Sequence, residues 1–427
     1  MNSNRVAEVL LLFLFVAVPS ASAARPAGSE PAPSVEDLVS RALEASPSVA
    51  ALLARLSSAR ESVEPAASLP DPVVEVGIQN VGLDTWTVGE TDMSMVTPEF
   101  RQGFSYPGKL RATRAEAEAN AELVERAVDA ARRQLTLGVR IAYARLYAVD
   151  RETELLAAGR ELLDLLKETA IARYRVGQSD QEAVLKAQLE VSRLAERDDD
   201  LTAERLGLVA GLNALLDRPG DAQLGDVVRL PPVQASTGGI ESEALERSAE
   251  VLARRAALAA AERRLDVART RLKPDLFASA GVGYRGGLDP AFMLRLGAEV
   301  PLRRRSRQEP LLRSAEHDVE AAAAEVRHAE AGARAEAARL AANWRRSERQ
   351  VVRYREAFVP QASAAFDAAR ASYLAGRGDF STVIEDYRLW LDTRAALARR
   401  EAERFATWAE IASLVGSAES AGRGETR

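Results

Sequence analysis

The chain of 427 residues contains no cysteine, which excludes disulfide bonds, thiolate metal ligands and cysteine nucleophiles. Its formal net charge is −6, which argues against the basic face that a nucleic-acid-binding protein presents. Histidine is scarce: His317 and His328 share one helical face but lie ~16 Å apart along the helix axis, so within one chain they cannot bind a common ion. Lysine is nearly absent beside abundant arginine, and occurs only as Lys109, Lys167, Lys186 and Lys273.

Long apolar runs are also missing, since no stretch after the N-terminus approaches the ~20 residues that a membrane-spanning helix needs. Arg5 precedes a short apolar run, and an Ala-x-Ala motif ends at Ala23. This pattern predicts a signal peptide over residues 1–23; the alternative is a buried N-terminal helix. With no cysteine after the run, we expect an exported chain without a lipid anchor. Any contact with a membrane must then use strands or an interfacial helix.

An internal repeat organises the rest of the chain. Glycine can end a helix in the left-handed conformation and aspartate can cap the next helix, so each copy predicts the tip of a helical hairpin. Four residues recur at one constant offset (373 − 174 = 199): Tyr174, Gly177, Asp180 and Val184 match Tyr373, Gly376, Asp379 and Val383.

Each repeat has the same predicted order of a helix, two strands and a long helical hairpin. We expect prolines 310 and 360 to interrupt the second hairpin. The first repeat is predicted at 24–216, with a helix at 35–67, strands at about 73–81 and 98–106, and a hairpin at 108–216. A linker at 217–239 follows, and then the second repeat at 240–416, with a helix at 241–272, strands at about 275–285 and 291–300, and a hairpin at 303–416. Residues 417–427 are predicted to be a disordered tail.

The four strands alternate apolar with small or polar residues, which is the per-strand signature of an outer-membrane barrel. Four strands cannot close a barrel, and open sheet edges are not tolerated in lipid. Several copies of the chain must therefore pool their strands, most simply with cyclic symmetry. The hairpins, ~100 Å long and charged throughout, would continue the lumen through aqueous space.

Over residues 35–416 the chain resembles the TolC-type outer-membrane efflux channels. The motifs that carry the resemblance, besides the duplicated order, are Leu69-Pro70-Asp71-Pro72, Tyr106-Pro107-Gly108-Lys109-Leu110, Tyr174-Arg175-Val176-Gly177, Val184-Leu185-Lys186-Ala187-Gln188 and Gly376-x-x-Asp379-Phe380. The resemblance implies a mainly α fold with a small transmembrane β part, in a homotrimer with a twelve-stranded barrel and a periplasmic α-helical barrel closed at its tips.

The resemblance also implies partners: outer-membrane lipid, a periplasmic adaptor (membrane fusion) protein, and an inner-membrane pump of the RND type. Three segments look most like the heavy-metal branch of the family: Gln79 to Gly82, Met93 to Met95, and Tyr106 to Leu110.

The second tip is the expected gate. By resemblance, Tyr373 helps to hold the duct closed, and Glu385 with Asp386 contributes to an acidic ring at the entrance, which would attract cations. The alternative is that both carboxylates are solvated helix residues. The expected adaptor contacts are Arg173, Arg175, Gln178 and Arg377, any of which could equally be an ordinary solvated tip residue.

Two further patterns have the residue types of binding sites. Met93 and Met95 could offer thioethers to a soft metal such as Cu(I), although two thioethers alone make a poor site. The Gly-x-Gly-x-x-Gly spacing that starts at Gly281 lies in an alternating strand rather than before a helix, so it does not predict a dinucleotide site. No other metal site, cofactor site or catalytic constellation remains, so an enzyme is not expected.

The sequence therefore predicts a passive exit duct of a tripartite efflux system, with heavy-metal cations as cargo. The same duct could instead serve drugs or other organic compounds, or type I protein secretion. A different class of protein, a periplasmic coiled-coil adaptor or structural protein, is the second alternative.

Overall fold

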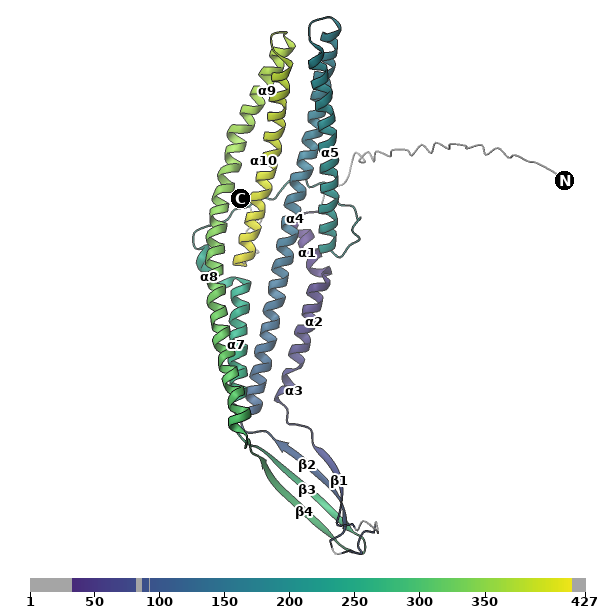
Figure 1. Ribbon diagram of the computed structural model, residues 1–427, viewed down its shortest axis with the longest axis vertical. Helices are drawn as coiled ribbons and strands as arrows, with labels where there is room; N and C mark the ends of the chain where they lie inside the picture. Colours follow the sequence, from purple (N-terminus) through teal and green to yellow (C-terminus); the bar gives the residue numbers. More distant parts are fainter. Residues whose placement is uncertain (1–32, 82–86, 92, 417–427) are drawn as a thin grey trace, which may run out of the picture.

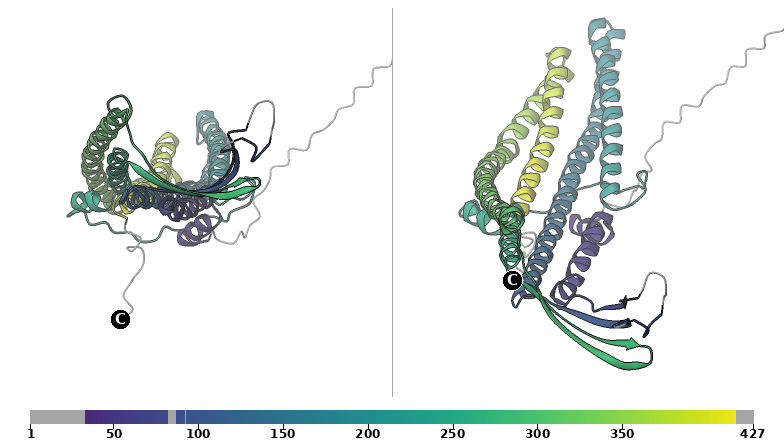
Figure 2. Two further views of the ribbon diagram at one scale, coloured as in Figure 1. Left: turned by 90° about the horizontal axis from the view of Figure 1, so that it is seen from below. Right: turned by 60° about the horizontal axis from the view of Figure 1, so that its bottom comes forward.

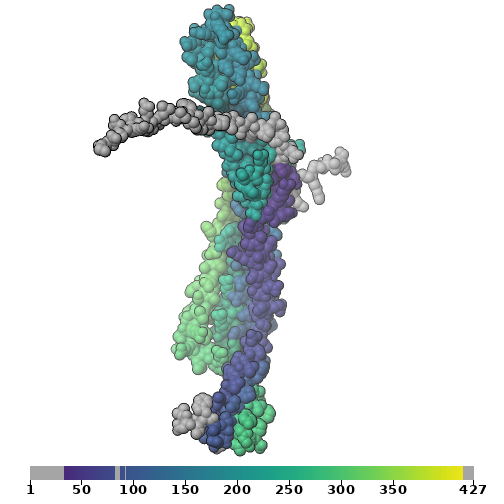
Figure 3. Space-filling model, turned by 90° about the vertical axis from the view of Figure 1, so that its right-hand side faces the viewer, coloured from purple at the N-terminus to yellow at the C-terminus, as the bar shows by residue number. Residues whose placement is uncertain are grey.

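The computed structural model describes residues 33–81, 87–91 and 93–416. The predicted signal peptide and C-terminal tail lie outside these residues. The molecule is elongated, with a β-sheet at one end and two helical tips at the other (Figures 1 and 3).

The elements follow the duplicated order that the repeat predicts. The first half comprises α1 (Val35–Ala45), α2 (Pro47–Glu61), α3 (Val63–Ala67), β1 (Val73–Gln79), β2 (Met95–Phe104), α4 (Lys109–Arg175) and α5 (Gln181–Leu215). The second half comprises α6 (Ile240–Arg247), α7 (Ala249–Thr270), β3 (Asp275–Arg285), β4 (Leu288–Glu299), η1 (Arg304–Gln308), α8 (Glu309–Arg353), η2 (Tyr354–Phe358), α9 (Val359–Leu374) and α10 (Phe380–Val415).

The helices form four parallel columns along an arc (Figures 1 and 2). The 67-residue helix α4 runs from the sheet to the first tip. It packs against α2 on one side and α7 on the other near the sheet, and against α5 and α10 near the tips. The first column is α4, the second is α2 continued by α5, and the third is α7 continued by α10 (Figure 1). The fourth column is α8 followed by α9, which pack against α7 and α10 respectively. One apolar core lies at mid-length, where α1 and α6 add to the columns, and a second lies between mid-length and the tips.

Proline explains the two interruptions in the fourth column. Pro310 and Pro360 are each the second residue of a helix, and a π-helical turn directly precedes each helix. Since proline has no backbone N–H and its ring crowds the preceding turn, the chain widens there instead of continuing a regular α-helix. The predicted helix at 241–272 also divides, into α6 and α7, with Ser248 between them.

The four strands form one antiparallel sheet in the order β1-β2-β3-β4. Two strands begin three residues earlier than predicted. Strand β2 begins at Met95 rather than 98 because Val96 pairs with both Ile78 and Tyr284. Strand β4 begins at Leu288 rather than 291 because the tight turn before it lets Leu288 pair with Arg285.

One face of the sheet is apolar and exposed. Directly opposed residues share a face, so pairs such as Val74 with Phe100, and Val282 with Phe292, make this apolar face continuous across all four strands. Phe292 is 86% exposed. Large exposed apolar surfaces mark contacts with membranes or other proteins. The other members of this face include Val76, Ile78, Phe104, Leu276, Tyr284, Leu294 and Leu296.

The opposite face is polar and closely packed. Glu99 forms an ion pair with Arg295 at 2.5 Å, and the guanidinium of Arg101 lies 4.1 Å from the ring centroid of Phe277. That ring covers Gly297, where an added Cβ would lie 2.2 Å from the nearest ring carbon, so no larger side chain fits beneath it. Within the described residues, no helix combines the length and the apolar character needed to cross a membrane.

Candidate functional site: the hairpin tips

The two tips have the same backbone geometry. Gly177 and Gly376 adopt positive φ angles of 72° and 77°. The N–H groups of Gln178 and Arg377 donate to carbonyls five residues earlier, at 2.9 and 3.0 Å. This is the Schellman ending of a helix, which favours glycine at the left-handed position. The repeated glycine therefore sets both turns.

The matched tyrosines have different environments. Tyr174 is 48% exposed, whereas Tyr373 is 3% exposed. The ring of Tyr373 packs edge-on against Phe380 at a centroid distance of 5.3 Å, and the guanidinium of Arg173 lies 4.5 Å from its centroid. Burial raises the pKa of Tyr373, and the nearby charge of Arg173 opposes that rise. Tyr373 is thus a residue of the second tip that contacts a side chain of the first tip, that of Arg173.

Further polar contacts join the tips. Arg173 donates to the carbonyl of Leu374 at 3.0 Å, and the ammonium of Lys186 donates to the hydroxyl of Ser381 at 2.7 Å. Arg173, predicted as an adaptor contact, therefore bridges the two hairpins within the chain. The other three candidates for adaptor contact, which are Arg175, Gln178 and Arg377, are exposed and form no ion pair with any described residue.

Two buried carboxylates link the hairpins below the tips. The carboxylate of Glu190 on α5 is 6% exposed and accepts from Nε of Arg388 on α10 at 2.8 Å. Closer to mid-length, the carboxylate of Glu152 on α4 is 4% exposed. It accepts from Nε of Arg197 on α5 at 2.8 Å and from Nε of Arg399 on α10 at 3.0 Å. Glu152 therefore connects three of the four columns.

These carboxylates were not identified from the sequence, although a signal was present. Glu152 lies three residues after Val149 and four before Leu156, so it interrupts an apolar stripe of α4. Glu190 has the same relation to Ala187 and Leu194 on α5. A charged residue in an apolar helical stripe is rarely buried without a partner. Its partners here come from other helices, whose register the sequence does not give.

The hairpins carry grooves on opposite faces. Tyr147 and Arg151 of α4 line one groove together with Val228 of the connection between the repeats, and that connection follows the convex side of the arc (Figure 2). The opposite groove, of about 410 Å³, is lined by residues that include Glu152 and Arg399. It accordingly lies on the concave side.

Glu385 lies on the same side of α10 as the concave groove. Glu403, which lines that groove, is 18 residues further along α10, and 18 residues make five helical turns. Glu385 is exposed and forms no ion pair with any described residue, whereas Glu403 is paired with Arg400. Asp386, the next residue of α10, is half-buried and also forms no ion pair with any described residue. Glu385 is thus a carboxylate on the concave side near the tip that has no direct ion pair, although its charge interacts with those of Lys186 and Arg388.

The methionine pair lies at the far end of the molecule. Met93 is 51% exposed and has a positive φ, whereas Met95 is 3% exposed and its sulfur packs against Gly283 of β3. Only Met93 is accessible. Among the described residues, no group of three or more histidine, aspartate or glutamate side chains is arranged to hold a metal ion.

Comparison with known proteins identifies the class of molecule. Residues 38–216 and 240–417 match the family described as outer membrane efflux protein, one match for each repeat. The chain belongs to this family. It is an outer-membrane efflux channel of the TolC type and not an enzyme. Channels of this family are trimeric, have a periplasmic helical part, and work with adaptor and inner-membrane pump partners.

Solved structures show the same fold at low sequence identity. The outer-membrane protein VceC of Vibrio cholerae aligns with a TM-score of 0.75 and 20% identity, over 90% of this chain and 96% of that chain. The outer-membrane channel CmeC of Campylobacter jejuni aligns with a TM-score of 0.75 and 14% identity, over 92% of this chain and 90% of that chain. CusC, described as forming a transmembrane channel, aligns with a TM-score of 0.74 and 16% identity, over 89% of this chain and 91% of that chain. Among curated proteins, no sequence matches the chain.

Proposed function

We propose that three copies of this chain form the exit duct of a tripartite efflux system that exports heavy-metal cations across the bacterial outer membrane. The observation that carries the assembly is the continuous exposed apolar face of the sheet. The sheet is open at β1 and β4, and lipid does not tolerate open edges. Three copies pool twelve strands, enough for a closed barrel in which this face meets lipid.

In this assembly the helical columns continue the barrel into the periplasm. The concave side of the arc faces the lumen, and the tips end near the inner-membrane pump. The exposed side chains of Arg175, Gln178 and Arg377 are the proposed contacts with a periplasmic adaptor, because they have no ion-pair partner among the described residues. An inner-membrane pump of the RND type would deliver the cargo.

Two observations support cation cargo. Glu385 is an unpaired carboxylate on the concave side, and three copies would place an acidic ring in the duct. The segments at 79–82, 93–95 and 106–110 also resemble the heavy-metal branch of the family. Drug or organic-compound efflux and type I protein secretion remain the competing cargoes, because a duct has no substrate pocket and the pump selects what enters it.

A deletion strain tests the cargo directly. Loss of the gene is expected to lower the concentration of heavy-metal salts that stops growth, while leaving tolerance to organic antimicrobials unchanged. Growth would be measured against both classes of compound, with the intact gene restored on a plasmid as the control. Sensitivity to organic compounds alone would reject metal cargo and favour the drug-efflux alternative.

Replacing Glu385 tests the acidic ring. In planar bilayers Glu385→Ala is expected to reduce cation selectivity and relieve block by multivalent cations, because the substitution removes three negative charges from one constriction. The matched control is Glu168→Ala on α4. Glu168 is also exposed and also lies nine residues from a tip glycine, but on a different helix face. Equal reversal potentials for wild type and Glu385→Ala would exclude Glu385 as a selectivity residue.

A further inference from the structure

A cluster of unpaired cations lies where the sheet meets the helices. We use the name basic collar for five side chains just after α7 and around η1, namely Arg271, Lys273, Arg303, Arg305 and Arg307. All five are exposed, and none forms an ion pair with any residue that the structure describes. By contrast, every arginine within the neighbouring helix α7 forms an ion pair with a carboxylate, namely Arg254, Arg255, Arg263, Arg264 and Arg269.

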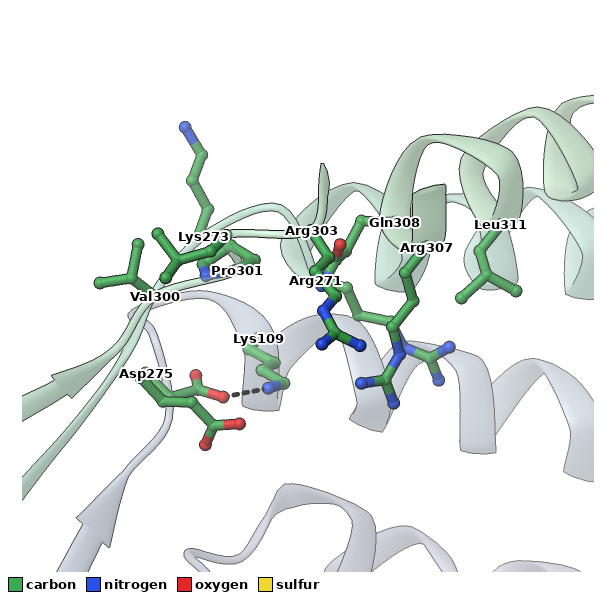
Figure 4. A pocket seen from close by; sticks show the side chains of 12 residues that line it. Lys109, Arg271, Lys273, Asp275, Val300, Pro301, Arg303, Arg307, Gln308 and Leu311 are labelled. Atoms are coloured by element: carbon green, nitrogen blue, oxygen red, sulfur yellow. Dashed lines mark hydrogen bonds and ion pairs between the residues drawn. The ribbon is translucent and has the colours of Figure 1, made fainter. Parts of the chain in front are cut away.

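The local carboxylates do not balance this charge. Asp275 is already engaged, because it pairs with Lys109 and accepts the backbone N–H of Tyr106 at 2.8 Å. Glu299 is the other acid lining the cavity of about 450 Å³ at this junction. Arg271, Arg303 and Arg307 line the same cavity (Figure 4). Like charges this close repel one another, so an anion bound among them would be favoured.

The basic collar directly continues the apolar face of the sheet. Val300 is 55% exposed and Leu302 is 89% exposed, and the arginines of 303–305 follow Leu302 immediately. Figure 4 shows the Lys273 side chain pointing away from the Lys109–Asp275 pair. Arg304 donates to the carbonyl of Leu272 at 2.7 Å, which fixes the arginine run beside the end of α7. A cationic group at the edge of a lipid-facing surface lies at the depth of the lipid headgroups.

We propose that the basic collar binds the phosphate groups of anionic phospholipids at the periplasmic edge of the outer membrane. The guanidinium groups would take the phosphate oxygens through charge-assisted hydrogen bonds, while Val300 and Leu302 contact the acyl chains. The ligand is a lipid rather than free phosphate, because the exposed leucine and valine adjoin the cations. This inference requires the sheet to lie in lipid, but it does not depend on the cargo or on the gate.

The test compares lipid retention by the full-length purified protein. Native mass spectrometry would follow the binding of phosphatidylglycerol and of phosphatidylcholine with the same acyl chains. The wild type is expected to prefer phosphatidylglycerol. In the triple variant Lys273→Gln/Arg303→Gln/Arg305→Gln, the preference for phosphatidylglycerol is expected to fall at least about tenfold. Each basic residue near an anionic surface raises the binding constant roughly fivefold. Replacing the same three positions by the other basic residue (Lys273→Arg/Arg303→Lys/Arg305→Lys) should retain the preference.

Controls separate the competing explanations. Arg254→Gln/Arg255→Gln/Arg263→Gln removes the same charge from ion-paired surface positions of α7 and should leave the lipid preference intact. Displacement of phosphatidylglycerol by millimolar inorganic phosphate would show a free-anion site and overturn the lipid assignment. Equal binding of the two lipids by the wild type would overturn the proposal altogether. Single-channel conductance in the same preparations reports on the duct, so failure of the collar proposal is distinguishable from failure of the proposed function.

Discussion

Replacing both Arg197 and Arg399 by glutamine is expected to lower the free energy of unfolding by about 3 kcal/mol. The carboxylate of Glu152 is 4% exposed, whereas Arg197 is 30% exposed and Arg399 is 55% exposed. The double substitution therefore leaves the buried member of the network without its two cationic partners. Removing one side of a buried pair costs about 3–5 kcal/mol, and the exposure of Arg399 places this site at the lower end. Urea unfolding in detergent, followed by circular dichroism, measures the loss.

Two comparisons isolate the buried charge as the cause. Adding Glu152→Gln to the double variant should restore most of the lost stability, because a neutral amide is less costly to bury than an unpaired carboxylate. The control Arg254→Gln/Arg255→Gln removes exposed ion pairs and should cost less than about 1 kcal/mol. If the double variant proved as stable as this control, Glu152 would not join the columns as described.

The sequence predicted the fold well because its main signals are local. The period-two pattern of residues 276–284 and the glycines at both tips depend on neighbouring residues alone. The constant offset of 199 then showed the duplication without any knowledge of packing. Strand ends were less accurate, since Val96 joins the sheet through partners on two other strands and Leu288 joins through the tight turn that returns it to Arg285.

The candidate site was predicted less completely. Tyr373 and Tyr174 occupy equivalent positions, and one local difference between them is that Phe380, which packs on Tyr373, stands where the first tip has Gln181. Burial of Tyr373 also depends on the approach of Arg173, some two hundred residues earlier in the chain, which the sequence does not show. Glu190 and Arg388 meet for the same reason, through the relative register of α5 and α10. Contacts of this kind depend on tertiary packing, which a single sequence does not show.

The contact between Arg173 and Tyr373 is expected to favour the closed state of the duct, so Tyr373→Ala should raise channel conductance. If the tips form the gate, its opening would break contacts between the hairpins, whereas the packing of Tyr373 on Phe380 lies within one hairpin and would remain. The cation–π contact contributes about 0.5–2 kcal/mol, and the hydrogen bond to the Leu374 carbonyl adds about 1 kcal/mol. A loss of about 2 kcal/mol shifts the ratio of open to closed tips by roughly thirtyfold.

Arg173→Ala should raise conductance at least as much as Tyr373→Ala, because it removes both contacts between the tips while leaving the Tyr373 ring in its core. The matched control is Tyr174→Ala, which removes the equivalent side chain of the first tip, where it is 48% exposed. Single-channel recording in planar bilayers would compare the three variants with the wild type. If Tyr174→Ala opened the channel as much as the other two, the effect would be general loosening of the tips. A rise confined to Arg173→Ala and Tyr373→Ala would show that this contact between the repeats holds the tips together, because Arg173→Ala leaves the packing of Tyr373 on Phe380 in place.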